Sequence, residues 1–512
     1  MRHTRRILFL ISLLLTLALL SPVRPAQTSG PPPLVKVRIA YQQREELTRL
    51  EGAGVDIWEV QPGYAVAVVS SEQEAALIRQ GYELEWLGTV SPLFTFDPQY
   101  HTYQEMVAEL QSLADTYPDL ARLVDVGDSW EKAQGRADRD LWALKIRSDP
   151  EGTDARPKVL FTAAIHAREL ATAEVALKLA AYLLESYGTD ADATHLVDTR
   201  ETWIVPLANP DGHIQAEDGK SWRKNTNHSE GACPGGWPPN SYGVDLNRNF
   251  SYQWGGDGSS GDPCNLTYRG SGSLSEPEDQ ALVTLIQGQG YSLVVSYHSY
   301  GEYILYPWGY TYESPPDLEL YQAIAHKMAS YNGYEAKQAS DLYPTNGDLT
   351  DWAYHEVGAL SFTVEMGTSF DPPYSTVEDL WQENKEPALY LLKIADDSAQ
   401  AYGPEATDLA LVMASLNLTL TATLSDADNG GQDIAAAEFF VDVLGDQGTG
   451  WPLVPADGAF DSRQEQVIAT LPWPGWGQHT LYLRGQDAEG HWGPVSAAFW
   501  KGYQSFLPIV IK

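Results

Sequence analysis

The stretch that most constrains the fold runs from Pro157 to Leu170 (PKVLFTAAIHAREL), where a short apolar run is followed at once by polar residues. The run Val159 to Phe161 is β-rich and predicts a buried strand, and the Ala/Leu-rich run Glu169 to Tyr187 has the apolar spacing of a helix. His166 and Glu169 therefore lie in the turn where the carboxyl end of a strand meets a helix. Ligand sites of open α/β sheets form at such turns.

An imidazole and a carboxylate so placed can both reach one divalent cation, and a third nitrogen or oxygen ligand from elsewhere would leave one position open for water. Taken alone, His166 and Glu169 fit better as two polar residues of a surface loop. The rest of the sequence has to decide between these interpretations.

Length and composition narrow the function classes. The chain has 512 residues, which is too long for a single hydrophobic core and predicts several domains. Hydrophobic residues make up 43% and charged residues 20%, so we expect a folded protein without long disordered stretches. The formal net charge of -36 opposes binding to nucleic acid or to an anionic membrane surface, because both would repel it.

Residues 1–26 have the pattern of a secretory signal peptide. Arg2, Arg5 and Arg6 precede the apolar run Ile7 to Leu20, and a polar stretch ends near Ala26. The run is short for a membrane span, and no later stretch is long enough to be one. We therefore expect a secreted, extracellular protein with no stable membrane span, and an uncleaved N-terminal anchor is the alternative.

Cys233 and Cys264 are the two cysteines of the chain. In an exported protein such a pair predicts one disulfide. A zinc-thiolate site is the weaker interpretation, because no second Cys or His stands beside either residue.

Residues 31–88 predict a small α+β domain of ferredoxin-like type. The pattern gives strand, helix, two strands, helix and strand over residues 35–41, 44–52, 56–60, 64–70, 71–80 and 82–87. Ser71 and Glu74 have the spacing of a capping box for the second helix. Nothing in this domain resembles a catalytic site.

Residues 98–400 predict an α/β domain with a mixed, mostly parallel sheet flanked by helices. A helix is expected over 102–117, strands over 121–126, 140–146, 203–207, 293–297 and 360–366, and a turn over 209–212. His298 closes one of these strands as His166 follows another, which makes it the candidate third ligand. Glu365 lies among apolar residues, where a buried carboxylate needs a metal, a water or a cation. The segments SWRK and GVDLNRNF add arginines suited to binding anions.

The same region resembles the zinc metallocarboxypeptidases of the A, B and T types, and most closely the bacterial carboxypeptidase T-like enzymes. The resemblance rests on six motifs in the family's order: IHARE, SWRKN, GVDLNRNF, SYHSYG, LYPTNGDLTDW and SFTVEMG. It implies a secreted zinc-dependent exopeptidase that hydrolyses the C-terminal peptide bond of peptides and proteins.

The resemblance also implies roles for individual residues. His166, Glu169 and His298 would hold one Zn²⁺ with water in the fourth position. Glu365 would act as general base on that water, and Arg223 would stabilise the developing oxyanion.

Five further residues match the family's substrate-binding positions. Asn247 and Arg248 would grip the free α-carboxylate of the substrate, which restricts cleavage to the chain end. Tyr343 matches the mobile tyrosine that closes over the bound residue. Arg168 and Tyr300 match outlying subsites.

Asp348 is our candidate for specificity. Basic-specific relatives carry an acid at the position of Thr350, whereas a placement like that of Asp348 accompanies acceptance of both apolar and basic ends in the carboxypeptidase T group. We therefore expect dual specificity. The alternative is that Asp348 only caps the turn at Asn346 and Gly347.

With a hydrolase in view, the N-terminal domain becomes a candidate pro-domain that inhibits its own enzyme, with the connector Gly88 to Gln99 as the processing site. An inert or protein-binding module is the alternative. The Gly/Pro-rich loop at Asn225 to Tyr242 has no readable path, and the disulfide is expected to hold it against the mouth of the site.

Residues 404–501 predict an all-β, immunoglobulin- or fibronectin-like sandwich without chemistry, with strands over 416–424, 437–443, 465–471 and 479–486. It could contact substrate or the cell envelope, or serve as a spacer. Residues 502–512 form a C-terminal tail with the apolar run Phe506 to Ile511. Ca²⁺ binding by acidic clusters is compatible with the sequence, but no motif assigns it.

Two other functions fit the same sequence. One is a peptidase of the same fold that cleaves peptidoglycan stem peptides. The other is a non-catalytic binding or adhesion protein that has kept the carboxypeptidase fold.

Overall fold

The computed structural model describes residues 34–90, 94–231, 233, 241–414, 417–472, 475 and 477–502. The predicted signal peptide and the apolar run of the C-terminal tail lie outside these residues. Among the described helices, none has the length and apolar character needed to cross a membrane.

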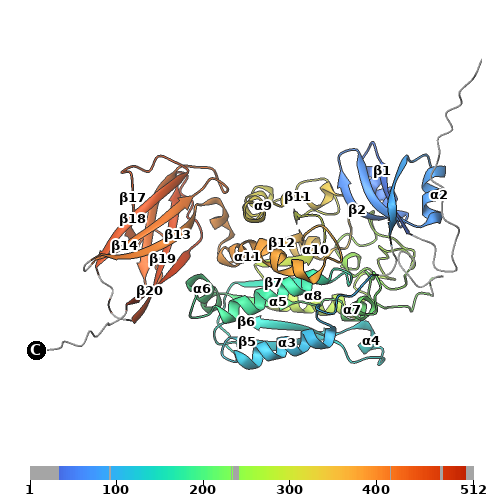
Figure 1. Cartoon of the computed structure of the whole chain (residues 1–512), viewed down its shortest axis with the longest axis horizontal. Coiled ribbons are helices and arrows are strands. Elements are labelled where there is room, and N and C mark those ends of the chain that lie inside the picture. The colour runs from blue at the N-terminus through green and yellow to red at the C-terminus, as the bar shows by residue number, and fades with distance from the viewer. Residues whose placement is uncertain are drawn as a thin grey trace, which may run out of the picture. The chain divides into compact units, whose positions relative to one another are not determined.

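An eight-stranded sheet occupies the middle of the chain (Figure 1). Its strand order is β11-β10-β12-β9-β7-β8-β6-β5. The strands are β5 (Ala121–Asp128), β6 (Asp140–Ile146), β7 (Lys158–Ala163), β8 (Glu201–Val205), β9 (Leu293–His298), β10 (Tyr303–Tyr306), β11 (Glu335–Gln338) and β12 (Leu360–Glu365). The four strands β12, β9, β7 and β8 pair in parallel at its centre, and β6 and β5 add antiparallel strands at one edge. The predicted mixed sheet is therefore confirmed.

Helices cover both faces of this sheet. The α-helices are α3 (Tyr103–Thr116), α4 (Trp130–Ala133), α5 (Leu170–Glu185), α6 (Ala191–Thr199), α7 (Pro210–Glu217), α8 (Pro277–Gln289), α9 (Leu318–Asn332), α10 (Leu349–Val357) and α11 (Val377–Lys393). Short 3-10 helices are η1 (Leu246–Arg248), η2 (Ala339–Asp341), η3 (Tyr374–Thr376) and η4 (Ser398–Tyr402).

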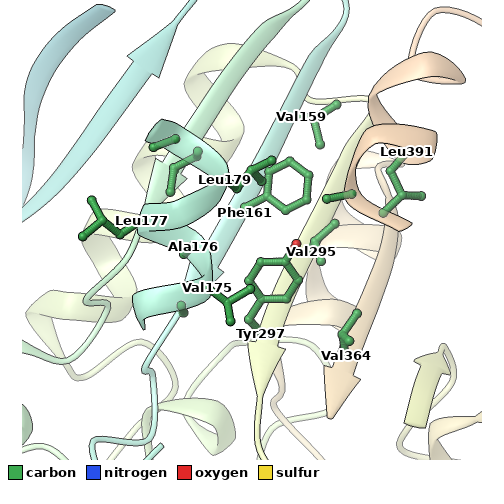
Figure 2. Close-up of a cluster of buried hydrophobic side chains, with 14 of the residues drawn as sticks. Val159, Phe161, Val175, Ala176, Leu177, Leu179, Val295, Tyr297, Val364 and Leu391 are labelled. Atoms are coloured by element: carbon green, nitrogen blue, oxygen red, sulfur yellow. The ribbon is translucent and has the colours of Figure 1, made fainter. Parts of the chain in front are cut away.

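Alternation along the strands divides the core between the two faces. Phe161 and Val295 belong to the apolar cluster under α3, α5, α9 and α11, whereas their neighbours Leu160 and Val294 belong to the cluster under α8 and α10. Figure 2 shows Phe161 near Leu179 of α5. The strands are apolar on both faces because both faces are covered.

Two local predictions were wrong. Residues 209–212 do not form an isolated turn but begin α7: Asn209 caps it by accepting a hydrogen bond from the Gly212 amide, and Pro210 takes the first helical position, where no amide proton is needed. The capping box of α2 (Ser71–Arg79) uses Ser70 and Gln73, one residue earlier than expected.

The N-terminal residues form a separate antiparallel sheet of order β2-β3-β1-β4. Its elements are β1 (Leu34–Ala40), α1 (Glu45–Gly52), β2 (Asp56–Gln61), β3 (Tyr64–Val69), α2 (Ser71–Arg79) and β4 (Leu84–Val90). An apolar cluster that includes Val37, Leu47 and Leu77 joins the sheet to both helices. Because β4 continues to Val90, the start of the predicted irregular connector is in fact strand.

The C-terminal residues form two four-stranded sheets of orders β13-β14-β18-β17 and β16-β15-β19-β20. Their strands are β13 (Glu405–Ala414), β14 (Asn417–Ser425), β15 (Ile434–Val441), β16 (Trp451–Pro452), β17 (Val454–Pro455), β18 (Gln464–Pro472), β19 (Gly477–Asp487) and β20 (Ser496–Gly502). One apolar cluster takes residues from both sheets, including Leu420 of β14 and Leu483 of β19. The two sheets therefore share a core.

The buried strand β9 gives a direct test of this packing. Val295→Ala removes two methyl groups from a fully buried side chain and should lower the free energy of unfolding by about 2 kcal/mol. Val412→Ala is the matched control, because Val412 is 60% exposed and its truncation should change stability by less than about 0.5 kcal/mol. Urea unfolding monitored by circular dichroism would compare the two, and equal effects would contradict the assignment of Val295 to the core.

Candidate active site

Three buried side chains meet at the carboxyl ends of neighbouring strands. His298 is the last residue of β9, and His166 and Glu169 follow β7, which pairs with β9 in parallel. His166 Nδ1 lies 2.9 Å from Glu169 Oε1 and 3.2 Å from His298 Nδ1, and His298 Nδ1 lies 3.2 Å from Glu169 Oε2. None of the three is more than 4% exposed. Neighbouring strand ends therefore assemble residues that are far apart in the sequence.

The donor atoms of this cluster fit a zinc ion. Ligand atoms held about 2.1 Å from a tetrahedral zinc are roughly 3.4 Å apart, which is close to the three separations observed. A nitrogen, nitrogen, oxygen set is also what catalytic zinc sites use. His166, Glu169 and His298 form the cluster of potential metal ligands found among the described residues.

Electrostatics favour an ionised Glu169. Burial opposes the charge of its carboxylate, but the imidazoles of His166 and His298 outweigh burial and lower its pKa below the usual range. Although Glu169 occupies the N-terminal cap of α5, its side chain caps no amide of that helix and instead turns toward the two histidines. The main-chain amide of Ser299 donates to its second oxygen at 3.2 Å.

Asp245 connects this cluster to Arg223. Its carboxylate lies 3.2 Å from His166 Nε2 and accepts a hydrogen bond from Arg223 Nε at 2.9 Å. Asp245 is fully buried, yet Arg223 and His166 overcome that burial and hold its pKa well below the ordinary value. A carboxylate that contacts the other ring nitrogen of a metal-binding histidine fixes the orientation of that imidazole.

Glu365 lies at the end of β12, in register with His298 across the parallel pair. Burial raises the pKa of Glu365 to about 7, with the charge of Glu169 adding to the effect and His298 opposing it. A carboxyl group with such a pKa can exchange a proton near neutral pH.

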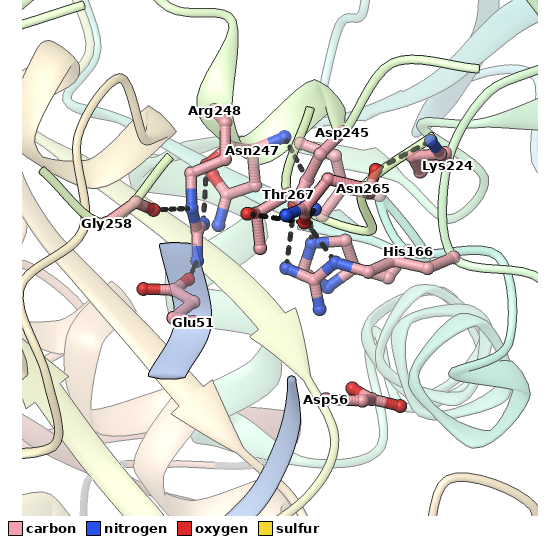
Figure 3. Close-up of polar contacts among 12 residues, drawn as sticks. Glu51, Asp56, His166, Lys224, Asp245, Asn247, Arg248, Gly258, Asn265 and Thr267 are labelled. Carbon is pink, nitrogen blue, oxygen red and sulfur yellow. Dashed lines mark hydrogen bonds and ion pairs between the residues drawn. The ribbon is translucent and has the colours of Figure 1, made fainter. Parts of the chain in front are cut away.

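Arg248 and Asn247 stand on η1 on another wall of the same cleft. Arg248 donates to the carbonyl oxygens of Gly258 and Asn247, both at 2.8 Å (Figure 3). Asn247 Oδ1 accepts a hydrogen bond from the Leu349 main-chain amide at 3.0 Å. This contact fixes the direction in which the side-chain NH2 group of Asn247 points. Both side chains are thus oriented before any ligand binds.

The N-terminal residues supply acidic partners to Arg248 and Arg168. Glu51 of α1 accepts a hydrogen bond from Arg248 at 2.9 Å, and both partners are buried. Asp56 of β2 accepts two parallel bonds from Arg168, at 2.8 and 2.9 Å. The Trp58 ring meets Tyr300 edge-on at 6.3 Å.

Tyr343 and Asp348 line the same cleft, whose empty volume is about 880 Å³ with open solvent included. Tyr343 packs against the apolar cluster of the N-terminal sheet. Asp348 caps α10, because its carboxylate accepts the Asp351 amide at 2.9 Å, and Thr345 donates to its other oxygen at 3.3 Å. Asp348 therefore caps a helix and faces the cleft at the same time.

The predicted disulfide between Cys233 and Cys264 is confirmed. The buried Lys224, next to Arg223, donates to the carbonyl oxygens of Pro263 and Asn265 on either side of Cys264, at 3.0 and 2.8 Å. The disulfide and the Lys224 side chain therefore both hold the segment around Cys264, and Lys224 is the neighbour of Arg223 in the sequence.

Three residues of the site went unassigned in the sequence. Asp245 lies in the motif GVDLNRNF, three residues before Arg248. An acid so close to an arginine could have been recognised in the sequence as a residue of the site. Glu51 and Asp56 lie in the N-terminal part of the chain, where the sequence has no catalytic motif, so nothing local marked them.

A buried His, Glu and His cluster beside a carboxylate and fixed arginines, at the carboxyl ends of parallel strands, defines a metal-dependent hydrolase. The sequence model of the zinc carboxypeptidase family matches residues 106–387, which is more than half of the chain, and the chain belongs to that family.

Relatives of this chain are named as carboxypeptidases. A zinc carboxypeptidase of Saccharothrix mutabilis subsp. capreolus is 33% identical over 373 residues, which cover 66% of this chain and 82% of that protein. Metallocarboxypeptidase A of Arthroderma otae is 33% identical over 291 residues, covering 54% of this chain and 65% of the relative. Mouse carboxypeptidase A4 is 30% identical over 276 residues, covering 52% and 62%.

Solved structures share the fold. Carboxypeptidase A of Helicoverpa armigera superposes with a TM-score of 0.61 at 23% identity, over 71% of this chain and 97% of that one. Thrombin activatable fibrinolysis inhibitor gives a TM-score of 0.57 at 24% identity, over 71% and 98%.

His298→Ala tests the metal cluster. The variant should lose the zinc that we expect to co-purify with the unaltered protein, because two remaining ligands hold zinc poorly. His326→Ala is the matched control, since His326 is exposed on α9, and it should keep a full complement. Mass spectrometric metal analysis measures both, and a zinc content unchanged in His298→Ala would place the ion elsewhere.

Proposed function

We propose that the chain is a secreted carboxypeptidase that removes single residues from the C-termini of peptides and proteins. The observation that carries this proposal is the placement of the Arg248 and Asn247 pair in one cleft with the cluster of His166, Glu169 and His298. A fixed cation at that position suits a free α-carboxylate, and the adjacent peptide bond then lies next to the metal ligands.

His166, Glu169 and His298 would hold the zinc. When bound, zinc supplies a Lewis acid that lowers the pKa of water toward neutrality and polarises a carbonyl group. Glu365 would take the proton of the attacking water and deliver it to the leaving amine, a role that suits a carboxyl group with a pKa of about 7.

Arg223 would face the developing oxyanion, with Asp245 fixing its guanidinium. Tyr343 would close over the C-terminal residue, while Arg168 and Tyr300 would contact the substrate chain further from the cut. In this arrangement the chain's own groups bind, orient and exchange protons.

The test uses N-blocked peptides that end in Phe, Leu, Lys, Arg and Glu, with protein trimmed between β4 and α3. Release of the last residue that stops on adding a chelator and returns with zinc is expected. Absence of release with zinc present would instead support a binding protein, or a peptidase for cell-wall peptides, which are the next substrates to assay.

We infer dual specificity from the position of Asp348. Its buried carboxylate has no basic partner among the described residues, so a Lys or Arg side chain of the substrate could supply one. Leu305 and Thr363 in the same cleft offer surfaces to apolar side chains.

Asp348→Asn separates charge from capping, because Asn remains a good helix cap. We expect kcat/KM for C-terminal Lys and Arg to fall about 10- to 100-fold, the value of a charge-assisted hydrogen bond. Release of Phe and Leu should stay unchanged and serves as the internal control. Unchanged release of Lys and Arg would leave Asp348 with the capping role alone.

We propose further that residues 31–88 form a ferredoxin-like pro-domain that inhibits the enzyme. Two contacts support this proposal. Glu51 accepts a hydrogen bond from Arg248, the arginine assigned to the substrate carboxylate, and Asp56 accepts one from Arg168. Both contacts would compete directly with peptide.

Replacing both acids tests this inhibition. The uncleaved chain with Glu51→Gln and Asp56→Asn should show at least about tenfold more peptidase activity than the unaltered uncleaved chain, since two charge-assisted contacts are lost. Glu45→Gln, an exposed position on α1, is the control and should remain inhibited. If all three precursors were equally inactive, steric cover alone would explain the block.

The remaining assignments complete the proposal. Residues 1–26 would direct export, which agrees with the disulfide. Residues 98–400 would form the catalytic domain, residues 404–501 an immunoglobulin-like sandwich able to contact the cell envelope, and residues 502–512 a short tail.

A further inference from the structure

An apolar groove lies at the edge of the C-terminal sheets where the chain crosses from one sheet to the other. The two-residue strands β16 and β17 make this crossing. The groove lies between Phe439 and Trp451 of one sheet and Val454 and residues 468–471 of the other. Its empty volume is about 1040 Å³ with open solvent included, and we call it the edge groove.

The edge groove opens onto the core that the two sheets share. Phe439 and Leu471 belong to that apolar cluster, and Ala469 packs against it. At the rim, Trp451 is 57% exposed and Val454 is 55% exposed. Large apolar side chains gathered around a hollow mark a surface that another apolar segment covers.

The main chain beside the groove has an open edge. β18 continues to Pro472, but β17 pairs with it only at Val467 and Ile468. On its other side β18 is paired with β14 along its whole length. The outer edge of residues 469–472 therefore has no strand partner among the described residues. An extended segment can add to such an edge and place alternate side chains in the adjoining groove.

β20 ends close to this open edge. Because β19 runs antiparallel to both β15 and β20, the last residues of β15 and β20 lie at the same end of their sheet. Gly502 of β20 pairs with Gly477 of β19, and Gly477 follows Pro472 by five residues. Five residues span at most about 18 Å, so Gly502 lies at the end of the two sheets that the open edge of β18 reaches.

The segment that follows β20 matches the groove in length and in chemistry. Residues 503–512 (YQSFLPIVIK) could extend over roughly 33 Å, and Tyr503 to Ser505 could serve as the link. The run Phe506 to Ile511 is apolar and contains three β-branched residues, which favour a strand. Pro508 is compatible with an edge strand, because one side of such a strand needs no amide proton.

We propose that residues 506–511 add to the open edge of β18 as a further strand and fill the edge groove of their own chain. Returning from Gly502, this strand would run antiparallel to β18. Leu507, Ile509 and Ile511 share one face and would enter the groove. Its own tail is the favoured occupant because a segment already attached beside the groove loses no translational freedom on docking, whereas a second copy or another peptide does.

Hydrogen exchange measured by mass spectrometry tests the proposal on the full chain and on a chain that ends at Gly502. Without the tail, residues 468–471 should exchange at least about tenfold faster, because edge amides lose their partners. Residues 419–421 of β14 pair on both sides and serve as the internal control, whose exchange should not change. Equal exchange of residues 468–471 in the two chains would overturn the proposal.

Ile509→Asp tests the docking in a chain of full length. A carboxylate is costly in an apolar groove, so this variant should show the same faster exchange at residues 468–471. Ser505→Asp, outside the apolar run, is the matched control and should keep the slow exchange. Peptidase activity should be equal in both variants. If the shortened chain does not fold, this pair decides, and slow exchange retained in Ile509→Asp would contradict the docking.

A disulfide identifies the chain whose groove the tail fills. Thr470 is exposed, and Thr470→Cys combined with Pro508→Cys or Val510→Cys should form a bond within one chain. Asp428→Cys with the same tail cysteines is the control and should stay reduced, because Asp428 is exposed at the opposite end of the sheets. A disulfide that joins two chains would assign the groove to a second copy. That result, or no disulfide at either position, would overturn the proposal.

Discussion

One buried carboxylate, Asp245, supports the whole candidate site. It contacts His166 on one side and Arg223 on the other, and it also accepts the main-chain amide of Asn247. A single group therefore sets the orientation of a proposed metal ligand, of the arginine proposed to face the oxyanion and of the turn that carries Asn247 and Arg248. The site behaves as one unit, because none of these three parts can shift without disturbing the other two.

Parallel strand pairing also positions the side chains of the site. The register of β12 and β9 places Glu365 beside His298, and the pairing of β9 with β7 brings the His166 turn next to them. A strand's register is fixed by its buried faces, so the apolar residues under both helical layers also fix the distances within the site.

The sequence predicts those parts that strand ends and motifs determine. His166, Glu169 and His298 could be singled out because they follow or close apolar runs, and Glu365 because it is a lone carboxylate among apolar residues. Their proposed roles came from the resemblance to a family. Contacts between the separate sheets could not be predicted, because the bond between Glu51 and Arg248 joins segments that are far apart in the sequence. The start of α7 was also misjudged, because Asn209 and Pro210 favour a turn and a helix start alike, and only the following residues' packing decides.

The acidic contacts of the N-terminal sheet have a further consequence when that sheet is taken as the proposed inhibitor. While it is joined to the enzyme, Glu51 faces Arg248 at an effective concentration that is on the order of millimolar for short tethers. After the connector is cut, the same contact must form between separate molecules at their actual concentration. Activation would then depend on dilution as well as on cleavage, so a crowded compartment could keep cut enzyme silent until it diffuses away.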